Sequence, residues 1–125
     1  MARDLAQHDD GRRVMLLQGG YYVVTGVAPF VSRRAFERVT GPKAEWWLVQ
    51  TVGGLATTIG GALLSAAVRR SASPELVGLA AGSAVTFAAV DVVHALRGRI
   101  ARTYLVDAGI QLGLLAAYGA SRQPR

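Results

Sequence analysis

Four long stretches of the chain are almost free of charged residues, and short segments rich in charge separate them. Residues 14–32 and 46–68 are completely uncharged, residues 76–96 contain one Asp and one His, and residues 103–121 contain one Asp. A bilayer core about 30 Å thick requires roughly 17–25 apolar residues in a helix, so each stretch is long enough to cross it. The pattern predicts an all-α integral membrane bundle of four transmembrane helices, with spans at about 14–31, 46–68, 75–96 and 103–120.

The charged segments complete the expected domain organisation. A single four-helix transmembrane domain covers residues 14–121, between a polar N-terminal tail at 1–13 and a basic C-terminal tail at 122–125. All connections between the spans are short, so neighbouring spans are expected to pack antiparallel. An even number of spans places both termini on one side of the membrane.

Local signals indicate where the helices begin and end. Phe36 and Val39 lie three residues apart among charged residues, which is typical of a short helix lying in the membrane interface. The sequence Thr40-Gly41-Pro42 should end that helix and supply the first turn of the next one. The sequence Ser73-Pro74-Glu75 combines a cap, a first-turn proline and a carboxylate at the positive end of a helix. The expected aromatic anchors at the membrane interface are Trp46, Trp47 and Tyr104.

A weak internal repeat relates the two halves of the chain. Residues 47–50, Trp-Leu-Val-Gln, match residues 104–107, Tyr-Leu-Val-Asp, at a separation of 57 positions. One interpretation is a duplicated two-helix unit, which would place two parallel repeats about an axis along the membrane normal. The other is coincidence, because short matches arise easily in apolar sequence.

Composition and charge agree with a membrane protein. Charged residues make up 18% of the 125 residues, whereas a soluble domain has about a quarter. More important is that the four long stretches occupy most of the chain, which excludes a soluble globular enzyme. The net charge is +6, but the basic clusters border the spans, which indicates lipid phosphate and not nucleic acid as their partner. All but one of the 14 basic residues are Arg. This composition suggests a GC-rich bacterial genome, and hence the bacterial cytoplasmic (inner) membrane.

Orientation in the membrane cannot be inferred from the basic residues. The N-terminal tail, second linker and C-terminal tail carry seven Lys or Arg, and the first and third linkers also carry seven. The positive-inside rule depends on this difference, which is zero. Either a partner or local detail sets the orientation, or both orientations insert and pair antiparallel.

Small residues recur four apart in three of the spans, which is the small-xxx-small pattern of membrane helix packing. They form seams either within one bundle or between copies in an oligomer. The packing residues are Gly53, Thr57, Gly61, Ser65, Gly78, Gly82, Gly109 and Gly113.

Polar side chains within the spans gather near the end defined by the first and third linkers. Ionisable groups within spans are costly, so Asp91, His94 and Asp107 are candidate functional residues. The other polar residues expected at this end are Gln111, Gln50, Arg33, Arg34 and Arg97. The cluster could be a network of ion pairs and hydrogen bonds, joining the aspartates to the arginines, that fixes the helix ends. It could instead be a site for a lipid head group or amphipathic molecule, or a proton- or ion-coupled path.

Metal and cofactor chemistry is not expected. Zinc, copper or haem sites require several His, Cys or carboxylate ligands, and one His beside one Asp is too few. The sequence contains no phosphate-binding loop, nucleophile elbow or dinucleotide fingerprint. The chain has no cysteine, so disulfides and thiolate sites are excluded. A lipid-modifying enzyme using Asp91 and His94 as an acid–base pair is the least favoured alternative.

The segments YYVVTG, FERVTGPK and WWLV, with VDVV and RGRI further on, resemble small four-span bacterial membrane proteins grouped with DoxX-like proteins. That resemblance implies architecture only, since the group has no settled activity. In size and span count the chain is also similar to small multidrug resistance transporters, which depend on a glutamate in the first span. The first span here has no carboxylate, so any transport would rest on Asp91 and Asp107.

These observations predict a small non-enzymatic membrane protein that self-associates or serves as an accessory subunit of a membrane complex. Its polar cluster would either be structural or hold a lipid or an amphipathic ligand. The alternative is a proton-coupled small-molecule transporter or channel that works through Asp91, His94 and Asp107.

Overall fold

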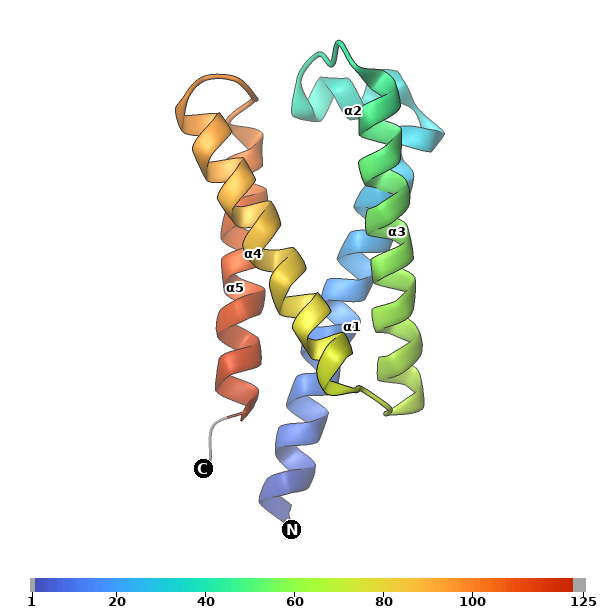
Figure 1. Ribbon diagram of the computed structural model, residues 1–125, viewed down its shortest axis with the longest axis vertical. Helices are drawn as coiled ribbons and strands as arrows, with labels where there is room; N and C mark the ends of the chain where they lie inside the picture. The colour runs from blue at the N-terminus through green and yellow to red at the C-terminus, as the bar shows by residue number, and fades with distance from the viewer. Residues whose placement is uncertain (1, 123–125) are drawn as a thin grey trace.

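The computed structural model describes residues 2–122, with side chains from Asp10 to Ser121, and these residues form a bundle of α-helices (Figure 1). The helices are α1 (Ala2–Val31), α2 (Arg33–Thr40), α3 (Trp46–Arg69), α4 (Pro74–Leu96) and α5 (Thr103–Arg122). The all-α prediction is confirmed. Within the described residues, three helical segments are long and apolar enough to cross a membrane: Asp10–Val31, Trp46–Arg69 and Pro74–Leu96. These segments indicate a membrane protein.

The long helices form two antiparallel hairpins. Helix α1 packs along α3, and α4 packs along α5. Helix α1 also contacts α5 and so joins the hairpins, whereas α3 and α4 have little contact. Helix α2 lies across one end of the bundle, and the described chain begins and ends at the opposite end (Figure 1). The last three residues of the expected C-terminal tail lie outside the described residues.

Helix α1 begins earlier than the sequence pattern predicts. The segment expected as a polar tail is helical from Ala2 onward and continues into the first apolar stretch. Nε of Arg12 donates a 2.8 Å hydrogen bond to the carbonyl oxygen of Ala67, near the end of α3. This bond attaches the polar part of α1 to α3. The polar part of α1 is therefore a component of the α1–α3 hairpin and not a separate tail.

The helix-start signal at Ser73-Pro74-Glu75 is confirmed, because Oγ of Ser73 accepts a 3.1 Å hydrogen bond from the backbone N–H of Leu76. The short helix expected between the first two spans is also present, as α2. Pro42 does not start the next helix, which begins only at Trp46. Lys43 Nζ donates to the carbonyl oxygens of Thr40 (2.6 Å) and Gly41 (2.9 Å), and these bonds hold the connection in a non-helical course.

Glycines seven residues apart, not four, bring α1 and α3 together. A Cβ atom added at Gly26 would lie 2.6 Å from the carbonyl oxygen of Gly53, and one at Gly60 would lie 2.6 Å from that of Gly19. Because a helix turns about 100° per residue, a seven-residue spacing returns to nearly the same face, whereas successive four-residue steps rotate away from it. Gly53 and Gly60 therefore face α1 with the two α1 glycines.

The expected small-residue seams are accordingly only partly present within one chain. Gly53 is in the α1–α3 seam, and Thr57 borders it, 2.5 Å from a Cβ added at Gly26. Ser65 is exposed. At the other expected packing glycines, an added Cβ would have no neighbouring atom within 4 Å; these are Gly61, Gly78, Gly82, Gly109 and Gly113. The prediction that they pack inside this bundle is therefore wrong.

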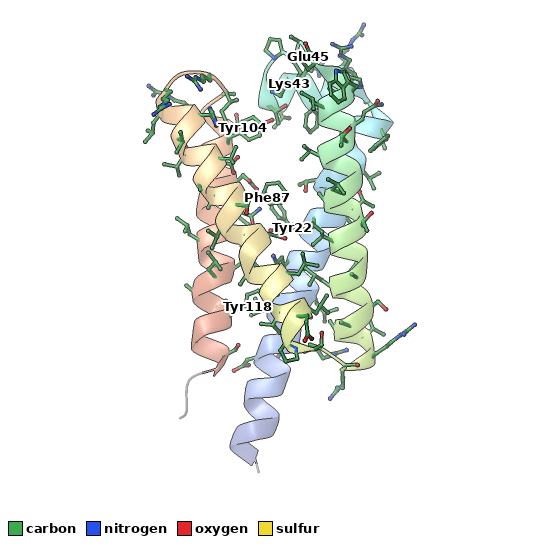
Figure 2. All side chains as sticks on the ribbon, in the orientation of Figure 1. Tyr22, Lys43, Glu45, Phe87, Tyr104 and Tyr118 are labelled. Carbon is green, nitrogen blue, oxygen red and sulfur yellow. The ribbon has the colours of Figure 1, made fainter. Side chains whose placement is uncertain are left out.

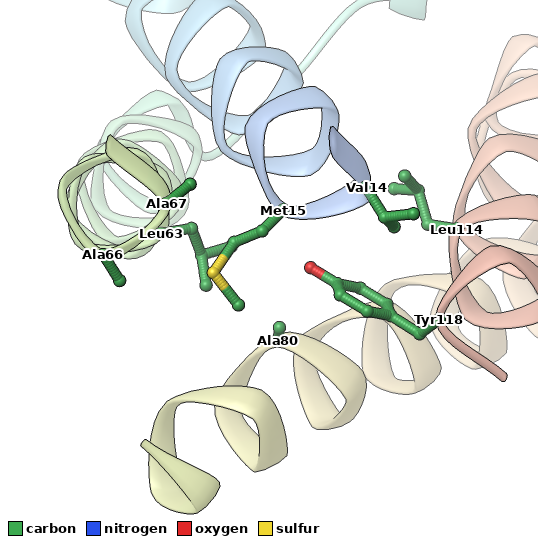
Figure 3. Close-up of a cluster of buried hydrophobic side chains, with 8 residues drawn as sticks. All are labelled: Val14, Met15, Leu63, Ala66, Ala67, Ala80, Leu114 and Tyr118. Atoms are coloured by element: carbon green, nitrogen blue, oxygen red, sulfur yellow. The ribbon is translucent and has the colours of Figure 1, made fainter. Parts of the chain in front are cut away.

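The apolar core lies toward the end of the bundle where the described chain begins and ends. Figure 3 shows Met15 of α1 beside Leu63 of α3, Val14 of α1 beside Leu114 of α5, and Ala80 of α4 near the Tyr118 ring. Helix α4 contributes a narrow buried stripe of alanines interrupted by one carboxyl group; its members are Ala80, Ala84, Ala88, Asp91 and Ala95. Because the alanines of α4 face the inside of the bundle, its glycines lie on the opposite, outward side of the helix.

Candidate functional site

Two carboxyl groups meet between α4 and α5. Asp91 occupies the alanine stripe of α4 and is only 5% exposed. Its carboxyl group lies close enough to that of Asp107 on α5 for the two to interact directly. Oδ2 of Asp91 is buried and has no hydrogen-bond partner among the described residues. A buried polar atom without a partner is rare in folded proteins and calls for an explanation.

Asp107 has two donors, in contrast to Asp91. The hydroxyl of Tyr21 on α1 and Nε2 of Gln111 on α5 both donate to Oδ1 of Asp107, the second at 3.3 Å. Gln111 was expected at this site, and the structure places it there, 2% exposed. A negative charge on Asp107 would therefore be better compensated than one on Asp91.

A series of buried hydrogen bonds continues from Gln111 toward the opposite end of the bundle. The hydroxyl of Tyr22 donates to Oε1 of Gln111 at 2.7 Å, and Nε2 of Gln18 donates to the Tyr22 hydroxyl at 3.1 Å. The hydroxyl of Tyr118 donates to Oε1 of Gln18 at 2.7 Å. Nε2 of Gln18 also donates to the carbonyl oxygen of Ala80 at 2.9 Å, so this series joins α1, α4 and α5.

Aromatic side chains lie on both sides of the carboxyl pair along the bundle: Phe87 one turn before Asp91 on α4, and Tyr104 one turn before Asp107 on α5. Figure 2 shows Phe87 beside Tyr22 and Tyr104 nearer the linker end. The Phe87 and Tyr22 rings meet edge to face at 5.4 Å, and Lys43 Nζ lies 5.1 Å from the centre of the Tyr104 ring. Tyr104 is half-buried and interacts electrostatically with both aspartates. Tyr104 is thus part of the site as well as an expected interface anchor.

The expected tryptophan anchors lie at the start of α3. Trp46 packs against the Arg33 guanidinium at 4.8 Å and the Phe36 ring at 5.7 Å. Trp47 is 63% exposed, and its Nε1 donates a 2.8 Å hydrogen bond to Glu45. Both rings therefore sit beside the charged linker, where amphipathic aromatic residues are favoured.

The arginines expected to neutralise the aspartates do not reach them. Nε of Arg33 instead forms an ion pair with Oε1 of Glu37 at 3.0 Å. Arg34 and Arg97 are exposed. Arg97 follows Asp91 by six residues, which is about 120° around the helix, so the two side chains diverge. The expected ion-pair cluster is therefore wrong.

Two further expected residues stay outside the hydrogen-bonded site. His94 is half-exposed on the turn after Asp91, and Gln50 is half-exposed on α3. Within residues 10–121, no hydrogen bond connects either side chain to the carboxyl pair. Helix α3 packs mainly on α1, which keeps Gln50 away from α5.

The linker beside the site has its own charge network, outside the spans. The backbone N–H of Lys43 donates to Oε2 of Glu37 at 2.6 Å, and this bond, with Arg33, holds the pKa of Glu37 below its ordinary value. Partial burial lowers the pKa of Lys43, while the nearby Glu37 carboxylate opposes that shift. The network connects α2 to the start of α3.

Sequence reasoning missed four residues of the site: Gln18, Tyr21, Tyr22 and Tyr118. A helical spacing could have indicated them. Gln18 and Tyr22 are four apart, and Tyr118 follows Gln111 by seven residues, so each pair shares one helix face. What spacing could not show is that these two faces meet.

The arrangement can hold a proton or a cationic group between two carboxyl groups, neither of which forms an ion pair with a basic side chain of residues 10–121. Within the described residues, no group of three or more His, Cys, Asp or Glu is placed to hold a metal ion.

Comparisons with protein-family models, curated proteins and solved structures found no match to this chain.

Proposed function

We propose that this chain is a non-enzymatic integral membrane protein that takes up a proton at the Asp91–Asp107 pair and couples this uptake to movement of a small molecule or ion. The observation that carries this proposal is the buried Oδ2 of Asp91, which has no hydrogen-bond partner in the part of the chain that the structure describes, although a second carboxyl group is adjacent. Two negative charges in a water-poor interior repel each other and lack hydration, so holding a proton relieves both costs.

The proposal includes α5 as a fourth span. Its 20 residues extend about 30 Å, the thickness of a bilayer core. Asp107 and Gln111 reduce its mean hydropathy, but both are hydrogen-bonded to neighbouring groups. The residues that α5 exposes include Val106, Ile110 and Leu112, which are suited to lipid.

Three further features of this proposal rest on the sequence: an internal duplication, the membrane in which the protein lies, and its family relationship. The duplicated two-helix unit is supported by the separation of 57 positions, which relates the start of α3, Trp46, to the start of α5, Thr103. The bacterial cytoplasmic membrane is the proposed location, and the DoxX-like group the proposed relationship. His94 is half-exposed one turn from Asp91, between the carboxyl pair and the linker end of α4.

A second candidate function is an accessory subunit or self-associating protein that holds a lipid or amphipathic ligand. Two observations favour it. The glycines of α4 and α5 face outward, where another helix could approach closely. A groove of about 410 Å³ between α1 and α5 has an apolar lining that includes Leu17, Ile110 and Leu114, with Tyr21 at its wall. Such a groove suits an alkyl chain with a polar group beside Asp107.

A pH jump on a solid-supported membrane separates the two candidates. Proteoliposomes should give transient currents when protons bind within the membrane. Asp91→Asn and Asp107→Asn should each abolish the currents, whereas Glu75→Gln, at an exposed carboxyl group, should leave them unchanged. If the folded wild-type protein gives no current, the proton-coupled function is wrong and the accessory role is favoured.

A further inference from the structure

We infer that the two carboxyl groups have fixed and different roles: Asp107 is the ionised acceptor, Asp91 carries the exchangeable proton, and the buried Gln–Tyr series sets this difference. The inference rests on the proposed function, because it assigns roles within the same carboxyl pair. It makes Gln18, Tyr22 and Tyr118 positioning residues that act through Gln111.

The direction of every hydrogen bond in the series follows from one backbone carbonyl group. The carbonyl oxygen of Ala80 can only accept, so the NH₂ group of Gln18 must face it. Oε1 of Gln18 is then directed at Tyr118, which must donate its hydroxyl proton. The same NH₂ group donates to Tyr22, whose own proton is left for Gln111.

The series therefore ends in a donor that faces Asp107. Because Oε1 of Gln111 accepts from Tyr22, the amide N–H of Gln111 is the group directed at Asp107. The Tyr21 hydroxyl adds a second donor to the same oxygen. Hydrogen bonds to an ionised carboxylate are stronger than those to a neutral carboxyl group, so this arrangement stabilises the negative charge on Asp107.

Asp91 has the opposite surroundings. Its Oδ2 is buried with no donor among the described residues, and the residues before and after it on the inner stripe of α4 are alanines. The carboxyl group of Asp107 is the acceptor beside it. A neutral Asp91 needs one acceptor for its proton, which an ionised Asp107 provides, whereas an ionised Asp91 would be uncompensated.

The other titratable groups near the pair do not reverse this assignment. Helix α1 presents Tyr21 and Tyr22, and α5 presents Tyr104, with Lys43 beyond its ring. Helix α4 carries His94 one turn from Asp91. The tyrosine hydroxyls of α1 donate toward α5, so both support the charge on Asp107.

Infrared spectroscopy of the full chain in lipid nanodiscs tests the assignment at neutral pH. A protonated carboxyl group has a C=O stretching band that a carboxylate lacks. We expect this band in the wild type, in Glu75→Gln and in Asp107→Asn, and its loss in Asp91→Asn. A band that survives Asp91→Asn, or disappears in Asp107→Asn, overturns the assignment.

The role of the series has its own measurement. In an Asp91→Asn background, acidification should protonate Asp107, so the C=O band should grow as the pH falls. The pH at which the band reaches half of its full intensity is the midpoint. Adding Tyr22→Phe should move that midpoint to higher pH by about one unit, because Gln111 is no longer held as a donor. Adding Thr51→Val, on the outside of α3, should leave the midpoint unchanged. If Tyr22→Phe also leaves the midpoint unchanged, the Gln–Tyr series does not cause the difference between the two carboxyl groups.

These outcomes are distinguishable from failure of the proposed function. A band lost only in Asp91→Asn, together with absent pH-jump currents, would support the assignment and refute the coupling. A wild type with no band would refute both, since the pair would then hold no proton.

Discussion

The Tyr22 hydroxyl donates a 2.7 Å hydrogen bond to Oε1 of Gln111 and so links α1 to α5 inside the bundle. This contact joins the two helical hairpins, because Tyr22 belongs to the α1–α3 hairpin and Gln111 to the α4–α5 hairpin. Both side chains are almost completely buried. The hairpins are thus connected by polar groups as well as by apolar packing, and the predictions below begin with this contact.

Tyr22→Phe should destabilise the bundle by about 1–2 kcal/mol, because it removes the donor to Gln111 and the acceptor of Gln18. Thermal unfolding in detergent, followed by circular dichroism, measures the effect. The matched control is Thr51→Val, since the exposed Thr51 hydroxyl bonds only to a carbonyl group of its own helix. Equal stability of the two variants would contradict the structural importance of this contact.

Gly60→Ala should destabilise the bundle by about 1–3 kcal/mol, whereas Gly61→Ala should be neutral or slightly stabilising. A Cβ at residue 60 would lie 2.6 Å from the carbonyl oxygen of Gly19, but one at residue 61 would meet nothing within 4 Å. Unfolding temperatures of the two neighbouring variants provide the comparison. Similar losses of stability in both would show that the α1–α3 seam is placed incorrectly.

Gly82→Leu and Gly113→Leu should weaken self-association without lowering the stability of the monomer. Both glycines face outward from the hairpin of α4 and α5, so a large side chain there has space within one chain. Between two chains the same side chain would prevent close approach of the helices. Native mass spectrometry from a mild detergent reports the oligomeric state. Unchanged oligomers in both variants would exclude these faces as the interface.

Acid should loosen the connection between α2 and α3 through Glu37. Its pKa is lowered in the folded chain by the Lys43 backbone N–H and then by Arg33. A lowered folded pKa means that the stabilisation is complete above the ordinary value of 4.5 and is lost as the pH falls through the lower folded value. Glu37→Gln should remove this pH dependence.

The fluorescence of Trp46, in a Trp47→Phe background, reports the Glu37 transition. Trp46 packs against Arg33 and Phe36, so its surroundings change when the connection loosens. Glu75→Gln, far from the linker, should leave the acid transition in place. An identical transition in Glu37→Gln would assign it to another group.

Much of the architecture could be predicted from the sequence because it depends on local properties. The charge-free stretches predict long apolar helices, and the structure contains three that meet this description among the described residues. The Ser73 cap and the short α2 helix were also predictable. In both, a serine hydroxyl oxygen accepts a hydrogen bond from the backbone N–H three residues later, and such a bond depends only on local sequence. The helical structure of the polar N-terminal segment was not predictable, because Arg12 attaches this segment to α3 through a contact between residues far apart in the sequence.

The sequence by itself determined which residues are costly to bury, and it correctly placed Asp91, Asp107 and Gln111 near one end of the bundle. Only the tertiary structure decided their partners. Whether an aspartate meets an arginine or a second carboxyl group depends on the rotation of each helix about its axis, and this rotation is set by packing between helices. Glycines seven residues apart orient α1 against α3, and the α4 alanines turn Asp91 inward, away from Arg97.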